Sequence, residues 1–289
     1  MNLSDQDILR RLGRGESIAV ICVTAGITAS EFADWWSEQT ARRVPDMNGA
    51  QSAPVGSPVT IVRDEWGIPH INGDSDEDLF YGFGMAMAQD RLFQMDYLRR
   101  KGSGRLSEIL GSSGLEYDRL VRTVGLQRIA EAEWKRIPEE TAKLLTAFTA
   151  GVNAVIDQSA DKLPIEFDLL DYQPEPWTPI DCLVIEIEFC WYLTGRFPVI
   201  VVPELAKRTL GDGALYRAFL QGEANDECIL PPDAYPPNSP ERRAEPVGSA
   251  IGGPDDGVGS NNWAVSGRFT KSGQPLLASD PHIAFEAVS

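Results

Sequence analysis

The sequence predicts an α+β protein in which helices dominate. Over much of residues 75–220, apolar side chains recur at three- to five-residue steps, the spacing of one face of a helix. Strand-like alternation occurs at residues 59–64, and a second strand-like segment opens at residue 260. A chain of 289 residues can bury a sizeable core, on the order of 75% of its unfolded surface.

Composition excludes several kinds of partner and cofactor. The 26 Lys and Arg against 43 Asp and Glu give a net charge of −17, which argues against nucleic acid or a membrane as partner. A zinc site is not expected, because there are only two histidines and the four cysteines show no CxxC spacing. Free thiols are expected, since Cys182 and Cys190 lie two turns apart on one predicted helix.

The sequence pattern of residues 1–44 predicts a small N-terminal helical module with a helix-turn-helix-like outline. Thr28 or Ser30 can cap the third helix. Helical patterns cover residues 4–12, 15–25 and 28–42. A DNA-reading third helix would be basic, whereas this one carries Glu31, Asp34 and Glu38. We therefore expect a docking or oligomerisation module.

The same segment also has some features of an export signal. Arg10 and Arg11 precede an apolar run, but Asp5 and Asp7 interrupt the positive region that such a signal needs. We expect a folded segment and hence a cytoplasmic location, with the periplasm as the alternative.

Three further segments precede residue 260. Residues 45–58 are predicted to form a linker, because they are rich in Pro, Gly and Ser. Residues 59–230 predict the main helical region, in which Pro179 suits the first turn of a helix through Ile185. Residues 231–259 are too poor in apolar side chains to fold alone, and predict a flexible linker or an excised spacer.

Ser260 stands where this segment meets the strand that follows it. A Gly-Ser pair at such a border is ordinarily only a loop-to-strand junction. Cleavage before Ser260 would instead create an α-amine, whose ordinary pKa of roughly 7.7–8.0 suits it to act as base for the serine hydroxyl. Gly259 would tolerate the backbone geometry of the acyl shift that this cleavage requires.

Two blocks of sequence resemble the penicillin acylase family of N-terminal-nucleophile hydrolases. The second block resembles the start of the family's catalytic β chain and comprises Ser260-Asn261-Asn262-Trp263, Ser266-Gly267, Ser272-Gly273 and Asp280-Pro281-His282. The first resembles the opening of its α chain and comprises residues 62–71, 78–84, 88–96 and 99–108. The likeness covers roughly residues 58 to 289.

The resemblance implies a four-layer αββα sandwich, of which this chain supplies mostly the helical part, and an amide hydrolase formed by cleavage at Gly259-Ser260. Residues 260–289 would begin the catalytic chain, whose remainder would be the partner of the α region in a heterodimer. The family's oxyanion-hole residues fall in that remainder, so we expect no turnover from these 289 residues alone.

The resemblance also implies roles for individual residues. His282, 22 positions after Ser260, would orient the nucleophile or relay protons. The segment 191–197 would wall the acyl pocket, with Glu204 as one ligand of a structural calcium ion and no cofactor for catalysis. The implied substrate-binding residues are Trp191, Leu193, Phe197 and Ile283.

Two other classes of function stay open at this point. One is a non-catalytic binding or regulatory protein built on an acylase remnant, which predicts no cleavage before Ser260. The other is an enzyme using paired carboxylates such as Glu186 and Glu188, although these fit ordinary solvated or paired residues. A β-lactam, an N-acyl homoserine lactone and an N-acyl amino acid are all compatible substrates.

Overall fold

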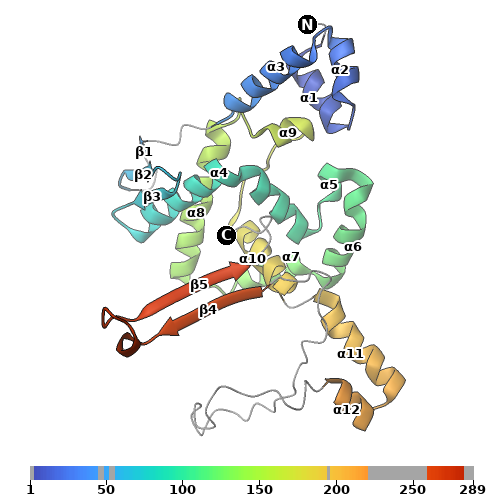
Figure 1. Ribbon diagram of the computed structural model, residues 1–289, viewed down its shortest axis with the longest axis vertical. Coiled ribbons are helices and arrows are strands. Elements are labelled where there is room, and N and C mark those ends of the chain that lie inside the picture. Colours follow the sequence, from blue (N-terminus) through green and yellow to red (C-terminus); the bar gives the residue numbers. More distant parts are fainter. Residues whose placement is uncertain (1–2, 45–48, 52–55, 194–195, 221–258, 283–289) are drawn as a thin grey trace. The chain divides into compact units, whose positions relative to one another are not determined.

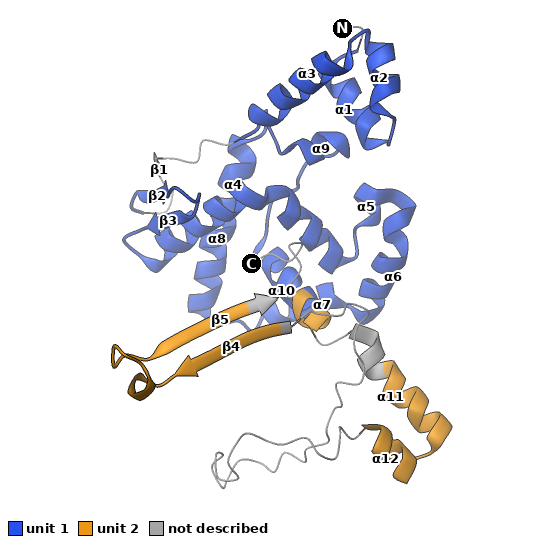
Figure 2. Cartoon of the chain, in the orientation of Figure 1, with its two compact units in different colours: residues 1–188 blue, residues 189–289 orange. Residues whose placement is uncertain are grey.

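A computed structural model describes residues 3–44, 49–51, 56–193, 196–220 and 259–282. The chain divides into two compact units, residues 1–188 and residues 189–289 (Figure 2). Each unit is described by itself. The elements are labelled in Figure 1.

The N-terminal module contains the three predicted helices. They are α1 (Asp5–Gly13), α2 (Ile18–Ala25) and α3 (Ala29–Ala41). A hydroxyl side chain caps the start of each helix and accepts a hydrogen bond from a backbone N–H. The capping residues are Ser4 for α1, Ser17 for α2 and Thr28 for α3. The prediction of a Thr28 cap is thereby confirmed.

This module shares its core with a later helix, α9 (Ile165–Leu169). Gly13 lies so close to α9 that a Cβ there would be 1.7 Å from the Leu169 carbonyl oxygen. Ion pairs join Arg10 to Asp171, at 2.8 Å, and Arg43 to Asp168. The core residues of the module are Ile8, Leu9, Ile21, Cys22, Ala25, Phe32 and Trp35. The segment therefore folds as part of unit 1.

In the part of the chain that the structure describes, no single helix has the length and hydropathy to cross a bilayer. The bent pair α2 and α3, at 99°, meets those criteria only when the two helices are taken together.

A small antiparallel sheet has the order β1-β2-β3. The strands are β1 (Gly49–Gln51), β2 (Val59–Arg63) and β3 (Pro69–Asn72). The predicted strand at 59–64 is confirmed as β2. β1 lies inside the predicted linker 45–58, whose other residues before Gly56 are outside the described part of the chain.

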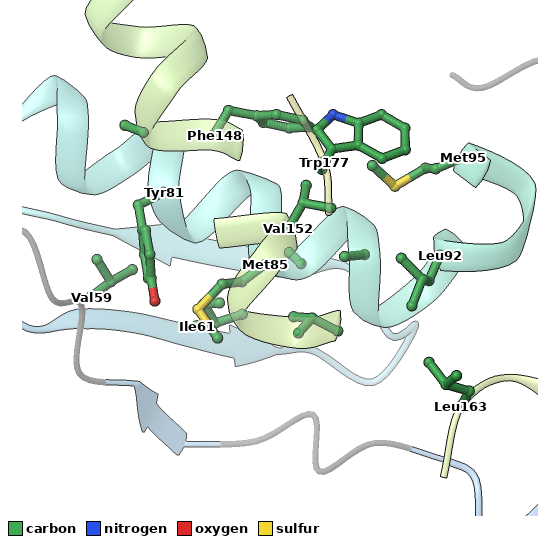
Figure 3. Packing of buried hydrophobic residues seen from close by; sticks show 14 of the residues in the cluster. Val59, Ile61, Tyr81, Met85, Leu92, Met95, Phe148, Val152, Leu163 and Trp177 are labelled. Atoms are coloured by element: carbon green, nitrogen blue, oxygen red, sulfur yellow. The ribbon is translucent and has the colours of Figure 1, made fainter. Parts of the chain in front are cut away.

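Two long helices, α4 (Asp76–Ser103) and α8 (Glu139–Gln158), form the centre of unit 1. Figure 3 shows Tyr81 and Met85 of α4 with side chains of α8, beside the strand that carries Val59 and Ile61. Glycines allow the two helices to approach. A Cβ on Gly84 would lie 2.1 Å from the Phe148 carbonyl oxygen, and one on Gly151 would lie 2.0 Å from that of Tyr81.

The remaining described helices follow in chain order. In unit 1 they are α5 (Ser107–Leu110), α6 (Leu115–Val124), α7 (Leu126–Trp134) and most of α10 (Pro179–Leu193). Pro179 begins α10, as predicted. Cys22, Cys182 and Cys190 are free thiols, whereas Cys228 lies outside the described residues.

Unit 2 contains the end of α10, two more helices and a β-hairpin. These are α11 (Arg196–Leu210), α12 (Ala214–Leu220), β4 (Gly259–Val265) and β5 (Leu276–His282). The predicted spacer 231–259 lies outside the described residues except for Gly259. The boundaries predicted at residues 44, 58 and 230 stay predictions.

Candidate active site

Ser260 is the second residue of β4, in an antiparallel hairpin with β5. The register pairs Gly259 with His282 and Ser260 with Pro281. The Gly259–Ser260 peptide bond therefore lies beside the backbone of His282, because opposite Cα atoms in such a ladder are about 4.5–5.5 Å apart. The fold thus brings together residues that the sequence separates by 22 positions.

Pro281 gives this part of the ladder an unusual feature. Since proline has no backbone N–H, the partner strand cannot donate a ladder hydrogen bond from the position opposite Ser260. The His282 side chain lies outside the described atoms, so its contact with the Ser260 hydroxyl stays a prediction.

The loop between the two strands explains the Gly and Ser residues of the motif. The Thr270 hydroxyl lies 3.1 Å from the Gly267 carbonyl oxygen and 2.7 Å from that of Gln274. Gly273 has a φ of 70°, a backbone conformation that favours glycine. Gly267 has no room for a side chain, because a Cβ there would lie 2.2 Å from the Gly273 carbonyl oxygen. These contacts hold β4 and β5 in register, and so set where Ser260 lies.

The hairpin is exposed although much of it is apolar. Ser260 is exposed, Trp263 is 53% exposed and Leu277 is 81% exposed. A two-stranded hairpin is marginally stable at best in water. The hairpin alone therefore does not supply the burial that this candidate site needs.

Three of the four predicted acyl-pocket residues belong to α10 and α11. Trp191 is half-buried and Leu193 is 60% exposed at the end of α10. Because they are two residues apart on a helix, they occupy different faces of it. Phe197 belongs to α11, but its side chain is outside the described atoms, and Ile283 is outside the described residues. Their role stays a prediction.

The predicted calcium ligand, Glu204, lies on α11 directly after Pro203. Its Oε1 accepts a hydrogen bond of 2.8 Å from Nε of Arg208, one turn later. In the described parts of the chain, no three His, Cys, Asp or Glu side chains come together as a metal site. Glu204 alone does not make a calcium site, which takes six to eight oxygen ligands.

A buried ion network in unit 1 was missed by the sequence analysis. Asp96 is fully buried and accepts hydrogen bonds of 2.8 Å from Nε of Arg99, Nε of Arg100 and the Tyr172 hydroxyl. Arg99 also lies over the Trp177 ring, 4.8 Å from its centroid. Burial, and then the Asp96 charge, raise the pKa of the Tyr172 hydroxyl well above its ordinary value.

This network ties α4 to the segment before α10. Arg105 strengthens it, because its guanidinium donates to Glu175, at 2.7 and 2.9 Å, and also to Glu108. The available sequence signal was the Asp96-x-x-Arg99-Arg100 spacing, which places a carboxylate one helical turn before two guanidinium groups. The role of this part of the acylase-like motif is structural in unit 1.

The turn between β2 and β3 explains another part of that motif. Asp64 Oδ1 accepts hydrogen bonds from the backbone N–H groups of Trp66, at 2.9 Å, and Ile68, at 3.0 Å. The His70 ring lies 3.2 Å from its other oxygen. The hydrogen bond from the Ile68 N–H is the main reason why the pKa of the Asp64 carboxyl lies below its ordinary value. The hydrogen bond with His70 is the next largest cause. Asp64 therefore acts as the anchor of a tight turn.

The carboxylates Glu186 and Glu188 do not form an acid–base pair. Glu186 is exposed, whereas Glu188 is 5% exposed. Glu188 accepts a hydrogen bond of 2.6 Å from the Tyr117 hydroxyl and lies 3.2 Å from the Lys101 ammonium. This agrees with the interpretation of ordinary solvated and paired residues.

Comparison with known proteins gives a consistent result. A penicillin amidase family model matches residues 58–289. The chain is 34% identical to penicillin acylase 2 proenzyme of Pseudomonas sp. strain SE83, over 84% of this chain and 32% of that protein. It is 28% identical to acyl-homoserine lactone acylase QuiP of Pseudomonas aeruginosa, over 95% of this chain and 33% of that protein.

A solved structure supports the same conclusion. The thermostable penicillin G acylase of Alcaligenes faecalis matches with a TM-score of 0.51 and 27% identity, over 60% of this chain and 96% of that chain. The fold class is therefore the predicted α+β class of the N-terminal-nucleophile hydrolases, of which this chain supplies a mainly helical portion.

The chain belongs to the penicillin amidase family. It spans about a third of the length of the curated relatives that it matches.

Proposed function

We propose that this protein is an amide hydrolase that removes an acyl group from an amine-bearing substrate, with Ser260 as an N-terminal nucleophile. The observation that carries the proposal is the position of the Gly259–Ser260 bond, at the start of β4 and beside His282 in the hairpin register. Relatives that carry the name acylase support the same chemistry.

The first step is cleavage of the chain itself. The Ser260 hydroxyl oxygen attacks the Gly259 carbonyl carbon, the C–N bond breaks, and an ester joins the two residues. Water then hydrolyses this ester, which leaves a carboxylate on Gly259 and a free α-amine on Ser260.

The second step uses the new amine as general base. It takes the proton of the Ser260 hydroxyl as the oxygen attacks the substrate carbonyl, and the proton passes to the leaving amine. Water hydrolyses the resulting acyl-enzyme and releases a carboxylic acid. His282 would orient the amine in this cycle, and the remainder of the catalytic chain would supply the oxyanion hole.

The substrate class follows from the relatives' names and from the charge of the chain. Penicillins and acyl-homoserine lactones share an amide that joins an acyl group to an amine. We assign such small amides as substrates, with Trp191, Leu193, Phe197 and Ile283 as the acyl-pocket residues. A net charge of −17 argues against nucleic acid and anionic membranes as partners.

The test is hydrolysis of penicillin G and N-octanoyl homoserine lactone by the full-length gene product. Ser260→Ala should abolish release of the amine product, with at least about a thousandfold loss, because the hydroxyl that attacks the substrate carbonyl is removed. Ser279→Ala, at an exposed serine of β5, is the matched control and should retain activity.

Two results would count against the proposal. Equal activity in the wild type and Ser260→Ala would assign the chemistry elsewhere. A folded, uncleaved wild type that hydrolyses neither amide would favour the non-catalytic alternative.

The N-terminal module gives a secondary proposal on location. The capped helices α1 to α3 share a core with α9, so we infer that this segment is retained in the mature protein and that the protein is cytoplasmic. Cell fractionation with N-terminal sequencing tests this. A periplasmic protein that has lost the α1–α3 segment would contradict it.

A further inference from the structure

We propose that a cavity in unit 1 binds a monocarboxylate that carries an apolar tail. The cavity has a volume of about 530 Å³ and lies where the end of α3, the β2–β3 turn, the middle of α4 and the end of α8 meet. None of the predicted active-site residues belongs to its walls. The proposal therefore concerns a second ligand site, separate from the proposed amide hydrolysis.

Much of the cavity wall is apolar. The apolar residues of the wall are Val44, Ala88, Leu92, Val155, Pro164 and Ile165. Leu92 and Val155 are also part of the main core, so this side of the cavity is rigidly held. A volume of this size lies in the range of small-molecule sites, which combine apolar walls with a few polar groups.

Four cationic side chains belong to the same walls. Arg43 and Arg63 are buried, with side chains only 7% and 5% exposed, whereas Arg91 and Lys162 are exposed. Buried guanidinium groups are costly unless they are paired. The pairing of these cations is therefore informative.

Two carboxylates only partly balance this charge. Arg63 pairs with Asp90, at 2.9 Å, and Arg43 pairs with Asp168. Among the described residues, neither Arg91 nor Lys162 has a carboxylate within ion-pair distance. Two of the four positive charges are thus left without a counter-ion.

Two buried donors also lack acceptors. The Nε atoms of Arg43 and Arg63 have no hydrogen-bond partner in the described part of the chain. Buried donors are normally satisfied, by protein, by water or by a ligand. Both orphan groups belong to residues that line this one cavity, although the two Nε atoms themselves lie below its accessible surface.

The α4 backbone is irregular at the same place. Arg91 has non-helical angles, φ −140° and ψ 19°, so the helix is kinked where residues 88–92 line the cavity. Neither proline nor glycine occurs at residues 88–92.

A carboxylate with an apolar tail fits both properties. Guanidinium groups match carboxylate oxygens in geometry and charge, and the tail would cover Leu92 and Val155. Inorganic phosphate would use the cations but leave the apolar wall in contact with water. We therefore assign the site to a medium-chain carboxylate, for which octanoate is the probe.

The test is isothermal titration calorimetry of the purified protein with octanoate. The variant Arg91→Gln/Lys162→Gln removes the two unpaired charges without touching the core, and should weaken octanoate binding at least about tenfold. Arg119→Gln/Lys135→Gln makes the same charge change at two exposed positions outside the cavity and should bind octanoate as the wild type does. The melting temperatures of both variants should stay close to that of the wild type.

Three further ligands complete the test. Acetate and phosphate lack the tail, and octylamine reverses the head-group charge, so all three should bind at least about tenfold more weakly than octanoate. The proposal is overturned if octanoate gives no saturable heat, if the Arg91/Lys162 variant binds it as well as wild type, or if acetate or octylamine binds equally well. The readout does not depend on amide hydrolysis.

Discussion

The α4–α8 body of unit 1 and the β4–β5 hairpin of unit 2 use similar apolar side chains in opposite ways. In the body, Met85 and Val152 are almost completely buried, and Figure 3 shows them packed with their neighbours. In the hairpin, Trp263 and Leu277 are mostly exposed. Among the described residues, those that form a complete core therefore do not include the proposed nucleophile, whereas the hairpin that carries it has no core of its own.

This difference shows how stability and chemistry are divided in the chain. Burial of apolar area is the main favourable contribution to folding, so unit 1 is expected to dominate the unfolding transition. The hairpin must gain its stability from contacts outside its own two strands. Substitutions in the two regions test this division.

Removing the centre of the buried ion network should cause the largest loss of stability. Asp96→Ala leaves Arg99 and Arg100 buried without their shared carboxylate, which should cost about 3–5 kcal/mol of unfolding free energy. Urea unfolding measures this. Asp157→Ala, at an exposed aspartate of α8, is the control and should change stability by less than about 0.5 kcal/mol. A loss below about 1 kcal/mol for Asp96→Ala would show that the network is not structural.

The same truncation in the two regions should have very different effects. Leu92→Ala removes a side chain that is 2% exposed, and should cost about 2–5 kcal/mol. Leu277→Ala, at 81% exposure, should change the unfolding free energy by less than about 0.5 kcal/mol. Equal losses in thermal or urea unfolding would mean that the hairpin is as well packed as the body.

The close approach of α4 and α8 should be sensitive to a single methyl group. Gly151→Ala would place a Cβ 2.0 Å from the Tyr81 carbonyl oxygen, so the helices must separate, at a cost of about 1–3 kcal/mol. Gly213→Ala is the matched control, because no atom lies within 4 Å of the new Cβ. If both variants melt at the wild-type temperature, the contact is looser than described.

The two cysteines of α10, Cys182 and Cys190, should differ in reactivity. Burial raises the pKa of the Cys182 thiol to about 11, so little thiolate forms at pH 8, whereas Cys190 is exposed. Iodoacetamide should therefore label Cys190 at least about tenfold faster in the native protein, as peptide mass spectrometry can follow. Comparable labelling rates would contradict the buried position of Cys182.

The raised pKa of the Cys182 thiol also predicts how the stability of the folded protein depends on pH. A thiol with a raised pKa favours the folded state below its ordinary value of 9.0, and this contribution is lost as the pH rises from there towards 11. Cys182→Ala should lack this part of the alkaline destabilisation.

Much of the fold could be predicted from sequence because local signals agreed. The three N-terminal helices follow from their capping residues, and the strand at 59–64 follows from its alternation. The docking of the N-terminal module on α9 could not be predicted, since it depends on Arg10 meeting Asp171, 161 positions later. Local spacing carries no information about such a contact.

The candidate site shows the same limit. Ser260 was found from its place between a Pro- and Gly-rich segment and a strand, and its pairing near His282 became visible only in the register of the hairpin. The cation-lined cavity was not predicted, because Arg43, Arg63, Arg91 and Lys162 come from different elements. Only the packing of those elements brings these side chains to one place.

The most direct test of the central claim is intact mass and N-terminal sequencing of the purified full-length gene product and its Ser260→Ala variant. We predict that the wild type contains a new chain that begins Ser-Asn-Asn-Trp and that the variant remains uncut. A folded wild type without this new chain, or a variant cut at the same bond, would contradict the assignment of Ser260 as a self-generated nucleophile.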